Sequence, residues 1–240
     1  MEAVDQIHTI ALFAKWGLKM NCEKTEITFI SKGTQDWKNT CKLGSLLDIN
    51  CDIQRRKILA QRMSNRCWKL WDKKFKLTLK TKVMFYNSLI RPILLYNCGT
   101  WGLTKQQLDA LESFNRRLLR KVIGIYHPNK LSCEAVYQVT NTKPLHGMIL
   151  KQRWNLFHKV LLMDEQSPAM YWTRQYFTCR LPRYRGRGNR TLAITLINDL
   201  HTIGFKLTDE QDLNRLQHIA RYDEQKWSKM ITSIFEKHSV

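Results

Sequence analysis

A row of cations with helical spacing is the first chemical feature of this sequence. If residues 52–73 form a helix, five cations fall within one narrow stripe of its surface at 100° per residue: Arg55, Arg62, Arg66, Lys69 and Lys73. The adjoining face carries Leu59, Met63, Cys67, Leu70 and Trp71. Lysine and arginine bind phosphate groups, and no acidic residue interrupts the stripe to form ion pairs one turn away. The pattern predicts a phosphate-facing stripe; a solvated charged face is the alternative.

A second group of cations crowds the last turns of a helix predicted between Thr104 and Gly124: Arg116, Arg117, Arg120 and Lys121. Cations stabilise the C-terminal end of a helix through its dipole. Four of them exceed what the dipole requires, so we expect some of them to contact nucleic acid.

The third group lies between residues 174 and 190, where six arginines occur without an acidic residue. Arg183, Arg185 and Arg187 alternate there with tyrosine and glycine. Arginine interleaved with an aromatic residue suits stacking and backbone contacts with single-stranded nucleic acid. A flexible basic linker explains the same composition equally well.

Catalytic motifs are missing from the sequence as given. It contains no G-x-x-x-x-G-K-[ST], H-E-x-x-H or G-x-S-x-G segment. No two aspartates are adjacent, whereas two-metal phosphoryl transfer needs carboxylates that converge on the metal pair. The seven cysteines are widely spaced, without a C-x-x-C pair. We therefore expect no catalytic residue, no metal site and no cofactor in this chain.

Charge and composition restrict the class of partner. The chain has 240 residues with 40 Lys and Arg against 20 Asp and Glu, and 43% of it is hydrophobic, which excludes a disordered tail. Residues 51–130 hold 18 basic and four acidic residues. Because this charge is concentrated in one third of the chain, we expect a polyanionic partner, RNA or a DNA–RNA hybrid.

The apolar runs are too short to cross a bilayer, and the first 20 residues carry Glu2 and Asp5 without a clean apolar core. We therefore expect no membrane association and an intracellular chain, in the nucleus or cytoplasm, that is not secreted.

These side chains must be positioned by a mainly helical fold with a short N-terminal β piece. Alternating residues predict strands at 26–30 and at Cys41–Leu47. Apolar periodicity predicts helices at 3–15, 52–73, 79–98, 104–124, 146–163, 191–203 and 209–221, and a last one around Trp227 and Ile234. Pro92 should break or kink the helix at 79–98. Capping boxes are predicted at Thr104–Gln107 and Thr208–Gln211.

Several segments resemble, in the same order, the reverse transcriptases of non-LTR retrotransposons. Gly17–Glu26 (GLKMNCEKTE) resembles the palm segment called motif D, and Lys42–Ser45 resembles the primer-grip strand that follows, with Lys42 in place of an aromatic residue. Residues of the family's thumb helix match at Lys82, Tyr86, Arg91-Pro92, Leu95-Tyr96 and Trp101. The C-terminal extension resembles the family at Arg185-Gly186-Arg187, Asp223 and Trp227.

The resemblance implies a palm remnant at 1–50, a helical, nucleic-acid-facing thumb at 51–130 and a helical C-terminal extension at 131–240. Within this extension we expect the Arg-rich segment at 174–190 to be a loop. Its parent activity is RNA-directed DNA synthesis with Mg²⁺ in the complete enzyme. The catalytic Asp-Asp would precede residue 1, so we expect this chain to be a C-terminal fragment, inactive alone, that binds nucleic-acid backbone without sequence specificity. Lys24 matches the motif D lysine near the incoming nucleotide. Alternatives are a helical nucleic-acid-binding protein unrelated to polymerases and a non-functional transposon remnant; the oligomeric state stays open.

Overall fold

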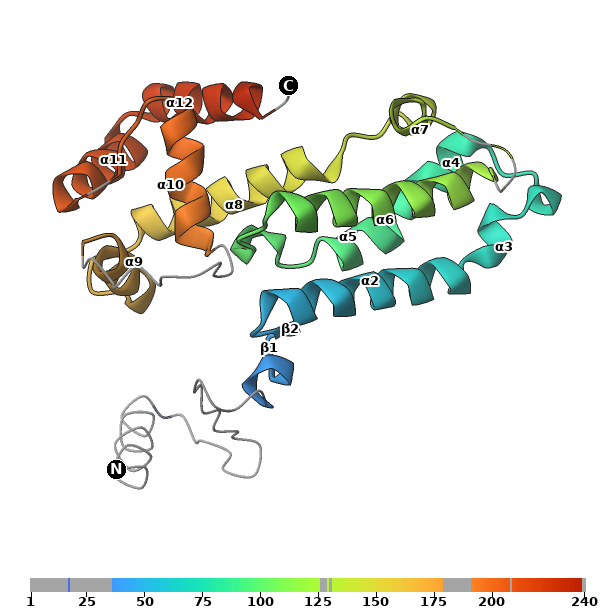
Figure 1. Cartoon of the computed structure of the whole chain (residues 1–240), viewed down its shortest axis with the longest axis horizontal. Helices are drawn as coiled ribbons and strands as arrows, with labels where there is room; N and C mark the ends of the chain where they lie inside the picture. Colours follow the sequence, from blue (N-terminus) through green and yellow to red (C-terminus); the bar gives the residue numbers. More distant parts are fainter. Residues whose placement is uncertain are drawn as a thin grey trace. The chain divides into compact units, whose positions relative to one another are not determined.

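The computed structural model describes residues 17, 36–125, 129, 131–178, 191–207 and 209–238. The chain forms two compact units, Met1–Asp48 and Ile49–Val240. Most described residues are helical, and a two-stranded sheet accompanies them, so the predicted fold class is confirmed at this level (Figure 1). The helix predicted at 3–15 and the strand at 26–30 lie outside the described residues.

The described part of the first unit contains the 3-10 helix η2 (Asp36–Asn39) and a hairpin of β1 (Cys41–Lys42) and β2 (Ser45–Leu46). The strands are antiparallel, with Cys41 opposite Leu46 and Lys42 opposite Ser45. The prediction of one strand over Cys41–Leu47 was therefore wrong. Leu43 and Gly44 both have positive φ, 47° and 81°, and two such residues form the tight turn that reverses a hairpin.

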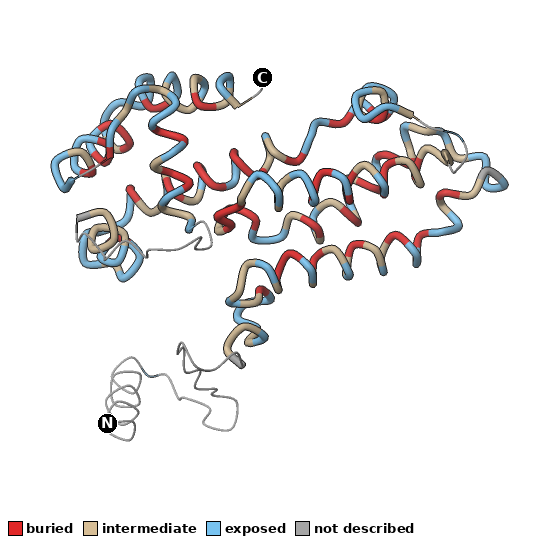
Figure 2. Tube along the Cα trace, viewed as in Figure 1, coloured by how far each residue is buried: buried red, intermediate tan, exposed pale blue. Residues whose placement is uncertain are grey.

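The second unit begins with helices around a first hydrophobic core. They are α2 (Ile49–Arg66), α3 (Trp68–Trp71), α4 (Leu79–Phe85), α5 (Arg91–Leu94), α6 (Lys105–Ile123) and α7 (Cys133–Thr140), with the 3-10 turns η3 (Lys73–Phe75) and η5 (Cys98–Thr100). Tyr86, Leu94 and Leu119 are fully buried at its centre. α2 packs on α5 and α6, and its buried positions lie on the side toward them (Figure 2).

A second core follows along the chain. It is built by α8 (Leu145–Leu162), α9 (Pro168–Thr178), α10 (Leu192–Thr202), α11 (Glu210–Tyr222) and α12 (Glu224–Lys237). The loop predicted over 174–190 was wrong at its start, because Arg174 to Thr178 belong to α9; residues 179–190 lie outside the described residues. α8 belongs to both cores, because Leu145 and Ile149 are buried in the first while Leu150, Trp154 and others are buried in the second. One helix thus connects the two halves of the unit (Figure 1).

The helix predicted over 52–73 is interrupted at Cys67, where α2 ends and α3 begins. Trp71 stabilises the break by folding back, since its indole Nε1 donates to the carbonyl of Ser64 over 2.9 Å. Lys82 Nζ in turn donates to the carbonyl of Trp71 over 2.9 Å. The predicted stripe therefore runs along one helix only as far as Arg66.

Pro92 disrupts the predicted helix at 79–98 upstream of itself. A π-helical segment, η4 (Tyr86–Ile90), separates α4 from α5, and Pro92 stands in the first turn of α5. A proline is tolerated there because the N–H it lacks has no partner within a first turn.

Helix starts were predicted unequally well. The capping box of Thr104 and Gln107 at α6 is confirmed, and Gly124 ends α6 with φ of 80°. Thr208, where a second box was predicted, lies outside the described residues. The described N-cap of α11 is Asp209, whose side chain accepts from the backbone N–H of Asp212 over 2.9 Å.

Candidate nucleic-acid interface

The predicted stripe on α2 faces away from the core. Arg62 and Arg66 are exposed, and within the described ranges no acidic side chain lies within 4.0 Å of either guanidinium. Arg55 is half-buried. The opposite face of α2 is held by buried Ile53 and Ala60. The two exposed guanidinium groups are consequently available to an anion from solution.

The two lysines of the predicted stripe do not continue it on α2. Lys69 is exposed on α3, with Nζ 5.9 Å from the ring centre of the exposed Trp68. A cation next to an exposed indole can engage phosphate while the ring stacks on a base. Of Lys73 only the backbone, within η3, is described.

The four cations near the end of α6 have different roles. Arg120 donates from Nη2 to the carbonyl of Leu131 over 3.0 Å and so ties α6 to the segment before α7. Lys121 Nζ donates to Oδ1 of Asn65 over 2.9 Å and ties α6 to α2. Arg116 is half-buried, whereas Arg117 is exposed and lies 5.1 Å from the Phe114 ring centre. Structural contacts thus occupy two of the four, and Arg117 is the most open to a ligand.

A groove of about 480 Å³ lies between α2 and α6. Its lining consists of Lys57, Ala110, Ser113, Phe114, Arg117 and Arg120. No carboxylate is among these described lining residues. Partial burial and the nearby charge of Arg117 lower the pKa of Lys57. Two cations that repel one another in a groove without a counter-ion are stabilised by a bound anion, so the groove is a second candidate phosphate site, on a different side of α2 from Arg62 and Arg66.

Sequence periodicity did not single out Lys57, because it lies well outside the stripe of Arg62 and Arg66 on a helical projection of α2. Its proximity to Arg117 arises only when α2 packs on α6, and neither helix signals that contact by its own pattern. The predicted site residues Lys24, Arg183, Arg185 and Arg187 lie outside the described residues.

The buried carboxylates of the described chain are committed to structural contacts. Asp52 lies 3.5 Å from Nε of Arg56 and accepts from the indole of Trp101 over 3.3 Å. Glu112 accepts from the Tyr137 hydroxyl and, over 2.9 Å, from the backbone N–H of His146. Both carboxylates therefore bind donors of the protein itself. They do not neutralise the exposed guanidinium groups of Arg62 and Arg66, which are suited to binding an anion.

The described residues form neither a metal-ligand cluster nor a membrane-spanning helix. No group of three or more His, Cys, Asp or Glu side chains is arranged there to hold a metal ion. Within the same part of the chain, no helix combines the length and apolar character needed to cross a membrane. Comparison of the chain with protein-family models, with curated proteins and with solved structures finds no match.

Proposed function

We propose that this chain is the C-terminal part of a reverse transcriptase of the non-LTR retrotransposon type, and that it binds nucleic-acid backbone without sequence specificity. The family assignment rests on the order of the segments that resemble motif D, the primer grip, the thumb and the C-terminal extension. One observation carries the binding activity: α2 exposes Arg62 and Arg66 without an acidic partner in the described chain.

Electrostatics supports binding to phosphate rather than to bases at this surface. Arginine and lysine displace condensed counterions from a phosphate backbone, so affinity depends steeply on salt. Such contacts position the nucleic acid but do not read its sequence. Arg62, Arg66 and Lys69 are all exposed cations, and each is assigned one phosphate contact here.

The test is a salt titration with a labelled RNA–DNA hybrid. The variant carries Arg62→Gln, Arg66→Gln and Lys69→Gln together. Its log–log slope of affinity against salt should be flatter by about two to three units, because each lost phosphate contact contributes about 0.9. Circular dichroism should show an intact fold, since exposed substitutions cost less than about 0.5 kcal/mol each.

A matched control removes the same charge elsewhere. Lys206, Lys229 and Lys237 are exposed, and their joint change to Gln should leave the slope nearly unchanged. Equal flattening in both triple variants would show that only net charge matters, and an unchanged slope in the first would remove α2 from the interface.

A helical nucleic-acid-binding protein unrelated to polymerases is the second candidate. The two cores of Ile49–Val240 favour it, because they form within one compact unit. A thumb that follows template and primer should bind an RNA–DNA hybrid more tightly than double-stranded DNA of the same length. Equal affinity for both duplexes would favour the second candidate.

A further inference from the structure

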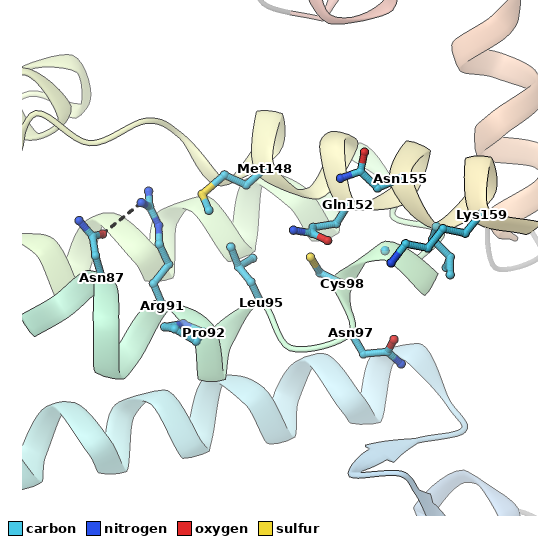
Figure 3. A pocket seen from close by; sticks show the side chains of 12 residues that line it. Asn87, Arg91, Pro92, Leu95, Asn97, Cys98, Met148, Gln152, Asn155 and Lys159 are labelled. Atoms are coloured by element: carbon cyan, nitrogen blue, oxygen red, sulfur yellow. Dashed lines mark hydrogen bonds between the residues drawn. The ribbon is translucent and has the colours of Figure 1, made fainter. Parts of the chain in front are cut away.

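A second hollow, of about 450 Å³, lies on the same unit between α5 and η5 on one side and α8 on the other. Figure 3 shows Asn87, Arg91 and Leu95 along one wall and the side chains of α8 along the other. Its volume is within the range of pockets that hold small ligands, about 300–1,000 Å³. We call it the α5–α8 cleft.

Backbone packing fixes the shape of this cleft. A Cβ atom at Gly99 would lie 2.8 Å from the carbonyl oxygen of Gln152, so glycine is required for η5 to approach α8 this closely. On α8, Met148, Gln152, Asn155 and Lys159 follow one another at spacings of three or four residues and so share one face. The wall of the cleft is therefore a regular helix face, set against a closely packed turn.

The polar groups of the cleft are amides and cations. Four amide side chains line it: Asn87, Asn97, Gln152 and Asn155. Arg91 and Lys159 supply two positive charges, and no carboxylate is among the described lining residues. The guanidinium of Arg91 is already held in place, because it donates to Oδ1 of Asn87 over 3.1 Å and to the carbonyl of Lys143 over 2.7 Å. Leu95 and Met148 add apolar surface.

The cleft is built for binding rather than for covalent chemistry. Its one thiol, Cys98, is 1% exposed. Burial raises the pKa of this thiol to about 11, so it stays protonated and is a poor nucleophile near neutral pH.

We propose that the α5–α8 cleft binds one nucleotide unit of a single-stranded nucleic acid, with the base against the amides and the phosphate at Arg91 or Lys159. An amide both donates and accepts hydrogen bonds, which matches the edge of a base, whereas a carboxylate ligand would only accept. Unstacked bases of single strands are recognised in this way, by edge contacts and by packing on side-chain surfaces.

This inference takes the class of ligand from the proposed function but uses different residues. The proposed backbone surface, Arg62, Arg66 and Lys69, binds phosphates without reading sequence, whereas the cleft adds a preference among bases. Failure of either can therefore be recognised separately.

The experiment measures binding of the full chain to AMP, GMP, CMP and UMP by calorimetry, with ribose 5-phosphate as the matched ligand without a base. At least one nucleotide should bind ten times more tightly than ribose 5-phosphate. The double variant Gln152→Leu, Asn155→Leu should weaken that nucleotide at least tenfold. Both side chains are exposed, so circular dichroism of the double variant should show an unchanged fold.

Lys159→Gln is a second variant. It should weaken the binding of nucleotides and of ribose 5-phosphate alike.

Two further measurements separate the cleft from the backbone surface. The triple variant of Arg62, Arg66 and Lys69 should bind the nucleotide with the affinity of the unchanged chain. The Gln152→Leu, Asn155→Leu variant should keep the salt dependence of binding to the RNA–DNA hybrid. Equal binding of all nucleotides and ribose 5-phosphate would reduce the cleft to an anion site and overturn the proposal. Tighter binding of an acetylated Glu-Glu dipeptide would overturn it in favour of an acidic peptide.

Discussion

Asp199 is a buried carboxylate on α10 toward which side chains from two other segments are directed. Its Oδ2 accepts from Arg153 over 3.0 Å and from the indole of Trp154 over 3.1 Å, both on α8. His238, which follows α12, places Nε2 3.3 Å from Oδ1. That distance allows an ion pair when the imidazole is protonated, although the ring is not aligned for a hydrogen bond. The carboxylate thus joins three helical segments around one charge.

His146 lies next to this cluster, and its pKa is lowered in the folded chain. Its ring lies 5.4 Å from that of His238, edge to face. Burial, the His238 ring and Arg153 lower the pKa of His146, while Glu112 and Asp199 oppose the shift. No other described group is a cause of the change. The folded chain therefore holds this imidazole neutral at a pH where the unfolded chain, with a pKa of about 6.5, binds a proton.

We predict that stability falls as pH decreases below about 6.5, and that His146→Gln reduces this loss. The sign follows from linkage, because the unfolded state binds more protons than the folded state in that range. Uptake of one full proton on unfolding would change the free energy of unfolding by about 1.4 kcal/mol per pH unit. The change removed by His146→Gln should be a fraction of this value, because the ring is partly solvated. Urea unfolding between pH 8 and pH 5 measures it. His201→Gln, at an exposed position, is the control; an equally steep acid loss in His146→Gln would contradict the assignment.

At the scale of elements, the start of α6 offers the clearest test of how local sequence stabilises the fold. Thr104 accepts from the backbone N–H of Gln107 over 3.3 Å, and the Gln107 side chain accepts from the backbone N–H of Thr104 over 2.7 Å. Two donors of the first turn are satisfied in this way. Leu103, just before the cap, is buried against the first core.

Thr104→Ala should lower the free energy of unfolding by about 1 kcal/mol, within the usual range of about 0.5–2 for a lost N-cap. Thr232→Ala provides a matched control, because Thr232 is exposed inside α12 and its hydroxyl donates only to the carbonyl of Ser228. Alanine favours helix interiors, so the control should be neutral or slightly more stable. If both variants unfold at the same urea concentration, the capping box contributes little.

Local signals explain what the sequence could predict about these elements. The α6 boundaries depend on a cap and a glycine within the helix's own ends, and both were predicted. The break at Cys67 depends on Trp71 reaching Ser64 and on Lys82 reaching Trp71. Such contacts form only in the packed chain, so the period of apolar residues continues across the break without a signal.

The candidate site shows the same division. The exposure of Arg62 and Arg66 follows from helical spacing, whereas the separate groove at Lys57 exists only because α2 packs on α6. The structural use of Arg120 likewise depends on a carbonyl at Leu131, outside its own helix. Cation counts in sequence therefore overstate how many charges are available to a ligand.

At the scale of the whole helical unit, α8 should make the two cores unfold together. Leu161 is fully buried in the second core and Cys98 is buried in the first, and α8 supplies buried residues to both. A cavity in one core weakens the helix that the other needs. The two cores should therefore behave as one cooperative unit rather than as two domains.

Leu161→Ala should destabilise the unit by about 2–5 kcal/mol. Pulsed alkylation of Cys98 in urea, followed by mass spectrometry, should show this thiol becoming reactive at the same lowered urea concentration at which helical circular dichroism is lost. Cys133, which is exposed, serves as the reference for the alkylation rate of a thiol that the fold does not cover. A Cys98 midpoint that stays at its original value while half of the helical signal disappears would mean that the cores unfold independently.

The close approach of Gly99 to Gln152 also determines how this sequence can diverge. At Gly99 any side chain places a carbon against the α8 backbone, so the residue is confined to glycine unless the two segments separate. The Gln152 side chain is exposed and can be replaced without that collision. The dimensions of the cleft are thereby fixed by main-chain atoms, while its hydrogen-bonding groups are free to vary. Descendants of this gene could change what they recognise one side chain at a time and keep the same cavity.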